Sequence, residues 1–162
     1  MELSTKVQQS IRESVLCWLA TYGADGFPNV TPKEAFMYDP SGHLLIANIA
    51  SPGSVGNIRL HPNVCASFIN VLTQKGYKIK GTAQILEHPD PGFQTARQLL
   101  QKLIGTRFEI ISIIQITPKQ VDPILAPSYR LFKDTTEETM VADSLKTYRV
   151  HQYSKTISQP ES

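Results

Sequence analysis

A Ser-Pro-Gly-Ser turn at residues 51–54 is the part of the sequence best suited to bind an anion. It follows an apolar run that ends at Ala47 and precedes a short stretch with helical character. The amide hydrogens of Gly53 and Ser54 would have no partner inside that helix, and the helix dipole adds positive charge at the same place. The hydroxyl groups of Ser51 and Ser54 add two further donors. The turn therefore predicts a phosphate site, with simple capping of the helix by Ser51 as the alternative.

The cysteines and the local basic cluster are weaker candidates for chemistry. Cys17 and Cys65 lie in apolar runs, without a second cysteine or a histidine at ligand spacing. We expect small buried side chains there rather than a disulfide, a metal site or a nucleophile. The cluster in residues 74–81 predicts a strand in which Lys78 and Lys80 face solvent, while the residues between them point inward.

The elements that must position the turn are mostly strands separated by turns that contain Gly or Pro. The sequence predicts strands at 15–22, 27–38, 43–48, 63–72, 77–88 and 108–124, and helices at 3–14, 52–60, 90–105 and 135–148. Asp90 is expected to cap the third helix, and Thr135 with Glu138 to form a capping box on the fourth. The last helix presents an apolar stripe: Met140, Val141, Leu145 and Tyr148. Because the helices are too few for parallel crossovers, a mainly β fold with a six-stranded antiparallel barrel and flanking helices is expected.

Length and composition place the chain among ordinary globular proteins. Its 162 residues, 41% hydrophobic and 19% charged, suit a single domain over 1–151 followed by a polar, disordered tail over 152–162. The net charge of +2 is scattered, which argues against a nucleic-acid partner. The polar N-terminus lacks a secretory signal, and no apolar run is long enough to span a membrane. We therefore expect a cytoplasmic protein.

The order of several short motifs carries a family resemblance. A DG-x-P turn at 25–28, a strand that ends before a short helix, an N-I-R-x-x-P-x-V segment at 57–64 and a G-x-x-x-K-G-x-A strand at 76–83 follow one another. This series resembles the pyridoxamine 5'-phosphate oxidase-like family of FMN-binding split barrels, roughly over residues 11–122. The resemblance implies a homodimer of six-stranded split barrels with FMN in grooves between the subunits.

The resemblance also implies a set of cofactor-binding residues. Residues 32–34 would run along the flavin, the strand end at 47–48 would meet the edge of its ring, and the turn at 51–54 would hold its phosphate. The implied residues are Pro32, Lys33, Glu34, Ala47, Asn48, Ser51, Gly53, Ser54, Asn57, Tyr77 and Lys78. Many relatives carry Lys or Arg in the phosphate turn where this chain has Gly53 or Ser54. We expect the missing charge to come from Lys33, Lys75 or Lys78, of the same subunit or of its partner.

The function expected from this resemblance is that of an FMN-dependent oxidoreductase acting on a small substrate. No catalytic residue is identified, although Glu34 and Tyr77 are the best candidates to approach the ring. Members of the family that oxidise pyridoxamine phosphate resemble one another in a basic, tryptophan-containing C-terminal segment. Efficient oxidation of pyridoxamine phosphate is not expected here, because the only tryptophan is Trp18 and the C-terminal region offers just Arg149 and His151. The alternatives are a non-catalytic flavin protein for storage, electron relay or sensing, and a split barrel that binds heme or a deazaflavin.

Overall fold

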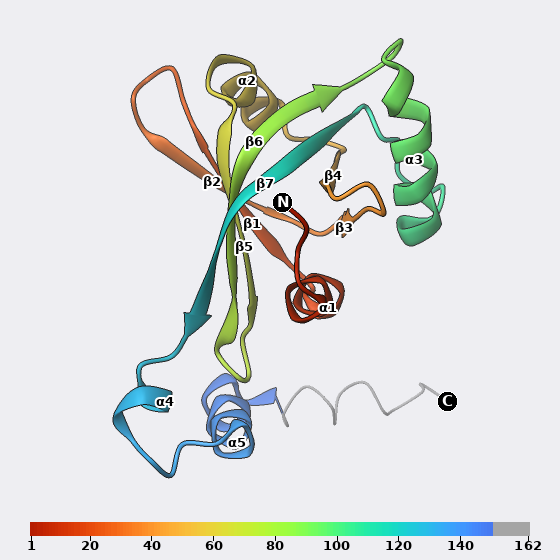
Figure 1. Cartoon of the computed structure of the whole chain (residues 1–162). Helices are drawn as coiled ribbons and strands as arrows, with labels where there is room; N and C mark the ends of the chain where they lie inside the picture. The colour runs from red at the N-terminus through yellow and green to blue at the C-terminus, as the bar shows by residue number, and fades with distance from the viewer. Residues whose placement is uncertain (151–162) are drawn as a thin grey trace, which may run out of the picture.

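The computed structural model describes residues 1–150, which form a curled antiparallel sheet surrounded by helices (Figure 1). The strands are β1 (Cys17–Tyr22), β2 (Pro28–Lys33), β3 (Phe36–Tyr38), β4 (Leu44–Asn48), β5 (Asn63–Asn70), β6 (Lys75–Leu86) and β7 (Ser112–Leu125). The helices are α1 (Thr5–Glu13), α2 (Pro52–Leu60), α3 (Pro91–Ile104), α4 (Ser128–Leu131) and α5 (Glu137–Tyr148). The mainly β, antiparallel fold predicted from the sequence is confirmed.

The order of the strands explains why the sheet curls. The order is β2-β1-β5-β6-β7-β4-β3, and every neighbouring pair is antiparallel. β2 and β3 therefore lie at opposite edges of the sheet, yet only Glu34 and Ala35 separate them in the chain. A connection this short requires the two edges to lie close together. The sheet bends into the split barrel that the resemblance implies.

The number of strands in residues 1–150 is seven rather than the expected six, because the predicted strand 27–38 is divided. Lys33 still pairs with Cys17 of β1, whereas Phe36 pairs with Ile46 of β4. The carbonyl of Ala35 already accepts the Ala47 amide at 2.9 Å. The chain thus changes partner strands within two residues. Its residue pattern stays that of a strand throughout, so periodicity could not reveal the break.

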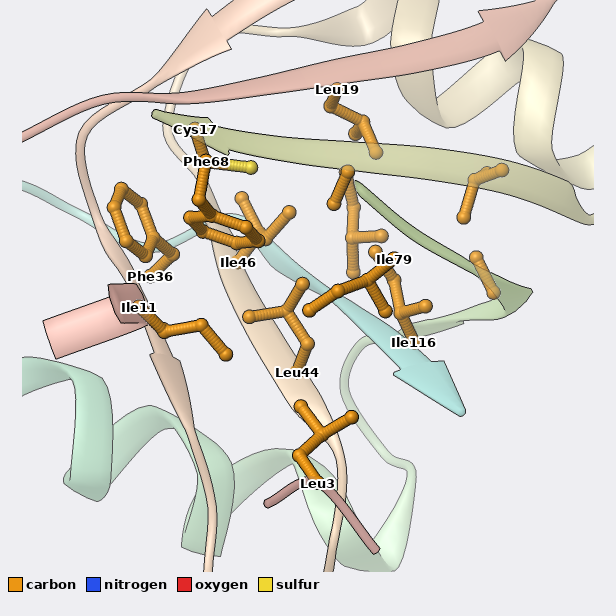
Figure 2. Packing of buried hydrophobic residues seen from close by; sticks show 14 of the residues in the cluster. Leu3, Ile11, Cys17, Leu19, Phe36, Leu44, Ile46, Phe68, Ile79 and Ile116 are labelled. Atoms are coloured by element: carbon orange, nitrogen blue, oxygen red, sulfur yellow. The ribbon is translucent and has the colours of Figure 1, made fainter. Parts of the chain in front are cut away.

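Two apolar clusters hold the fold together. One fills the barrel with side chains that point inward from several strands, including Leu19, Phe68 and Ile79, and Ile11 of α1 closes it from one end (Figure 2). The other lies between the outside of the barrel and α3, around Leu100. β4 contributes to both clusters, and all its residues are buried. This double burial explains the continuous apolar run that precedes the Ser-Pro-Gly-Ser turn.

The cysteines and the basic strand follow the predictions. Both cysteines are free; Cys17 is fully buried, and Cys65 is partly buried. Burial raises the pKa of Cys17 to about 12, which removes it as a nucleophile. In β6, Lys78 and Lys80 are exposed while Ile79 between them is buried.

The two predicted caps have different outcomes. Asp90 is the N-cap residue of α3 as predicted, but its carboxylate accepts the Glu87 amide at 2.8 Å instead of an amide of the helix. The capping box of α5 lies one residue later than predicted, with Thr136 as the cap and Thr139 as its reciprocal partner. A threonine hydroxyl therefore does what the glutamate of the usual pattern would do.

The C-terminal helices lie at the end of the β5–β6 hairpin, far from α2 and α3 (Figure 1). Ser144 of α5 donates a hydrogen bond to the Leu72 carbonyl at 2.9 Å. The apolar stripe on α5 remains largely uncovered in the single chain, with Leu145 37% and Tyr148 53% exposed. The predicted tail and His151 lie outside the described residues. Within residues 1–150 no helix has the length and apolar character needed to cross a bilayer.

Candidate functional site

A groove of about 440 Å³ lies where β2 and β4 both end. Its lining residues are Pro32, Lys33, Glu34, Ala35, Ala47, Ile49, Ala50, Ser51, Ile104 and Phe108. The groove exists because the chain crosses from one edge of the sheet to the other at this place and leaves a gap beside the crossing. Five residues predicted for the cofactor, Pro32, Lys33, Glu34, Ala47 and Ser51, lie together along it.

Lys33 is the most unusual residue of this groove. Strand alternation turns its side chain inward, toward the start of α2, and leaves it only 6% exposed. Its ammonium donates to the Ser51 hydroxyl oxygen at 2.6 Å and lies 3.4 Å from that of Ser54. Among residues 1–150 no carboxylate forms an ion pair with it. Burial lowers the pKa of Lys33, since an ammonium surrounded by hydroxyls and apolar groups is poorly solvated.

The start of α2 leaves its donors free. The side chain of Ser51 makes no capping bond to the helix, so the alternative of simple capping is wrong. The first bond of the helix runs from the Val55 amide to the Ser51 carbonyl at 3.3 Å. Within the described part of the chain, the amides of Gly53 and Ser54 have no hydrogen-bond acceptor. Lys33 and Ser51 line one end of the groove, and the amides of Gly53 and Ser54 follow Ser51 at the helix start without being among the groove's lining residues.

A buried pair of polar residues fixes this arrangement from behind. The side-chain oxygen of Asn48 accepts the Ser51 amide at 2.9 Å, and its nitrogen donates to the Ser112 hydroxyl at 2.9 Å. Asn48 is 6% and Ser112 3% exposed. The backbone of Asn48 was predicted to meet the edge of the flavin ring, and that contact stays a prediction, while its side chain is committed to this brace. Ser112 was not identified from the sequence, where the only signal is a polar residue at the start of an apolar strand.

The other predicted residues lie in different places. Gly53 is exposed at the first turn of α2. Asn57, further along that helix, donates to the Thr21 hydroxyl at 3.0 Å and faces β1. Tyr77 lines a separate cavity beside α1, and Lys78 is exposed on β6. The single chain does not bring Asn57, Tyr77 or Lys78 to the groove. Their contact with a cofactor stays a prediction.

One wall of the groove was missed by the sequence interpretation. Ile104, at the end of α3, and Phe108, in the connection to β7, face the strand ends. Residue 108 was predicted to begin a strand, but β7 starts at Ser112. The absence of clear alternation over 105–111 was the available signal. The wall gives the groove an apolar side opposite the backbone of β2.

Taken together, the groove has a cationic, donor-rich end and an apolar remainder. An anionic group fits beside Lys33 and the start of α2. A flat apolar group fits between the strand ends and the Ile104–Phe108 wall. Among the described residues no group of three or more His, Cys, Asp or Glu side chains is placed to hold a metal ion.

Comparison with known proteins agrees with this architecture. The sequence model of the family described as Pyridoxamine 5'-phosphate oxidase matches residues 3–139. The chain belongs to this family. The match includes the groove, the start of α2 and the Ile104–Phe108 wall. No curated protein matches the chain.

Several solved structures have the same fold, and the names of two of them mention different ligands. HupZ of group A Streptococcus has a TM-score of 0.66 and 18% identity, over 76% of this chain and 95% of HupZ. The heme storage protein HutZ of Vibrio cholerae has a TM-score of 0.58 and 20% identity, over 75% and 94%. An F420 reductase has a TM-score of 0.57 and 21% identity, over 74% and 98%. These similarities show the fold.

Proposed function

We propose that the chain binds FMN in this groove and acts as a flavin-dependent oxidoreductase on a small substrate. The observation that carries the proposal is the Lys33 ammonium, which is buried at the start of α2 and bonded only to hydroxyls among the described residues. A buried cation is stable when an anion neutralises it. The phosphate of FMN supplies that anion, and the free amides of Gly53 and Ser54 supply further donors.

The rest of the groove suits a flavin ring. Ala47 and Ile49 on one side and Ile104 on the other provide apolar surface. When bound, FMN would supply the electron and hydride transfer, while the chain supplies binding and orientation. Glu34 is the one carboxylate among the groove's lining residues in the described chain, and it is exposed. It is therefore the best-placed side chain to exchange a proton with a substrate.

The proposal includes a homodimer with the cofactor between the subunits. The outer face of β1 and β2 carries Trp18, Tyr22 and Val30, which are 42%, 45% and 54% exposed. Trp18 and Tyr22 lie two residues before and after Ala20, so their side chains point to the same face of β1 as that of Ala20. Val30 pairs with Ala20 in β2 and therefore lies on this face as well. β2 continues directly from this face into the groove at Pro32. A second copy covering the apolar face would close the groove.

A charge series at Gly53 tests the phosphate site. A side chain added at Gly53 or at Gly56, both in α2 and exposed, meets no atom within 4 Å, so substitutions at either should fold. Gly53→Glu should weaken FMN binding about tenfold by repulsion, and Gly53→Lys should strengthen it. Gly56→Glu, one turn further from the helix start, is the matched control and should change little. Fluorescence titration with FMN measures all three. Equal affinities across the series would place the phosphate elsewhere.

The spectrum of the purified protein tests the choice of cofactor. FMN gives a yellow two-band spectrum, and one FMN per subunit is expected. A heme band or a deazaflavin spectrum instead, with no affinity for FMN, would overturn the proposal in favour of a ligand such as those named for HutZ or F420 reductase. Turnover of NADH or NADPH with an electron acceptor then separates an oxidoreductase from a non-catalytic flavin protein. Light scattering that gave the 18.0 kDa mass of one chain would contradict the dimer.

A further inference from the structure

The wall formed by Ile104 and Phe108 exposes more apolar surface than the groove itself requires. Phe108 is 48% exposed although it lines the groove. The same segment exposes Leu103 by 59% and Ile111 by 61%. Large apolar side chains grouped at the mouth of a site usually contact a ligand or a partner.

This wall is anchored to the site rather than independent of it. The Ile111 amide donates to the Asn48 carbonyl at 3.0 Å, which ties the end of the connection to the end of β4. At its other end, Ile104 belongs to α3 and is packed against the cluster around Leu100. Phe108 is therefore held beside the groove from both sides.

The charges of the groove restrict what can bind against this wall. Lys33 is the one cation among the lining residues in the described chain, and under the proposed function it is used by the cofactor phosphate. The remaining charged lining residue is Glu34, whose carboxylate repels anions. All other lining residues beyond Ser51 are apolar. The described residues of one subunit thus give the groove contact to an aromatic molecule but no second cation for a negative charge.

From these observations we propose that the groove takes an uncharged aromatic substrate, which binds against Phe108 beside the cofactor. The inference rests on the proposed function, because Lys33 is available to a substrate anion if no cofactor phosphate occupies it. One nearby cation would favour an anionic ligand instead, because the Arg107 guanidinium lies 5.9 Å from the centre of the Phe108 ring. Arg107 does not line the groove, so it is expected to leave the preference for a neutral ligand unchanged.

The test uses two probes with the same ring system and different charge, 2-naphthamide and 2-naphthoate. FMN-saturated protein is titrated with each, and the perturbation of the flavin absorption spectrum reports binding without any turnover. We expect 2-naphthamide to bind at least ten times more tightly than 2-naphthoate. Glu34→Gln should reduce this ratio by strengthening the binding of 2-naphthoate alone.

Two phenylalanine variants locate the probe. Phe108→Ala should weaken the binding of 2-naphthamide about tenfold, and Phe108→Trp should retain it. Phe132→Ala is the matched control, since Phe132 is similarly exposed (59%) but follows α4 outside the groove. Equal binding of both probes, tighter binding of 2-naphthoate, or unchanged binding by Phe108→Ala would overturn the inference and leave FMN binding intact. If the wild-type protein binds no FMN, the proposed function fails and the inference fails with it.

Discussion

Two lysines show how differently this fold uses the same side chain. Lys75, at the start of β6, donates to the Glu137 carboxylate at 2.6 Å and lies 4.3 Å from the ring centre of Tyr129. The hydrogen bond that Lys75 donates to Glu137 raises the pKa of Lys75. Lys33, at the opposite end of the barrel, is buried among hydroxyls, and burial lowers its pKa. A lysine that already has its counter-ion joins two parts of the fold, whereas a buried one without it is suited to receive an anion.

The largest expected difference between the two lysines is in FMN binding. Lys33→Met should weaken FMN binding about 100-fold, because hydrogen bonds to a buried charge are worth about 1.5–3 kcal/mol or more. Lys75→Met should leave the affinity within about twofold, since the side chain serves the C-terminal helices. Fluorescence titration of both variants measures this difference. Similar losses in the two variants would show that Lys33 has no special role in FMN binding.

The brace behind Lys33 gives the next effect. Ser112→Ala removes the acceptor of the Asn48 side-chain amide, and leaving that buried group unpaired should cost about 2 kcal/mol of unfolding free energy. FMN affinity should fall several-fold as well, because Asn48 positions the Ser51 amide. Ser144→Ala removes a comparable bond at the C-terminal end and should destabilise without changing FMN affinity. Urea unfolding and FMN titration of both variants separate the two roles.

The two lysines should also differ in how pH affects FMN binding. FMN binding requires protonated Lys33, whose pKa lies below the ordinary value of 10.5 in the free protein. Above that pKa the affinity should fall by up to about tenfold per pH unit. Lys33→Arg does not titrate in this range, so any binding it retains should stay level with pH. Lys75→Met should keep the wild-type profile. A wild-type affinity that stays constant up to pH 10.5 would contradict the role of Lys33.

The smallest expected effects are on stability, and they have opposite signs. In the cofactor-free protein the lowered pKa of Lys33 means that its charge opposes folding near neutral pH. Lys33→Met should therefore stabilise the cofactor-free protein near neutral pH, a gain that disappears as the pH rises above 10.5. Lys75→Met should destabilise by about 0.5 kcal/mol, because it removes an exposed ion pair. Thermal unfolding without FMN measures both, and a destabilised Lys33→Met protein would contradict the assignment.

Much of the fold follows from local sequence patterns. The alternation in β6 follows from its residue types and was predicted correctly. The apolar run of β4 was recognised as a strand, but its burial on both faces became evident only from the structure. The division between β2 and β3 was missed because Glu34 and Ala35 continue the strand pattern while the chain changes partners. The one-residue error in the cap of α5 arose because neighbouring threonines, Thr135 and Thr136, are equally good caps. Such choices depend on contacts between elements.

The candidate site shows the same limit. The turn at 51–54 was identified because unpaired amides at a helix start are a local property. The sequence could not choose among Lys33, Lys75 and Lys78 as the source of charge, because the distance from each lysine to that turn depends on how the sheet curls. Ser112 and Phe108 were missed for a related reason: each reaches the groove only through a long-range connection.

The sequence by itself determined most of the strands, the short helix and the unpaired donors at its start, because each depends on neighbours a few residues away. Tertiary structure alone decided which side chains meet those donors. Folding the sheet so that its two edges approach one another brings Lys33 beside Ser51, and sends Lys75 to the other end of the barrel. Burial then lowers the pKa of Lys33, since the solvation of an ammonium depends on everything packed around it.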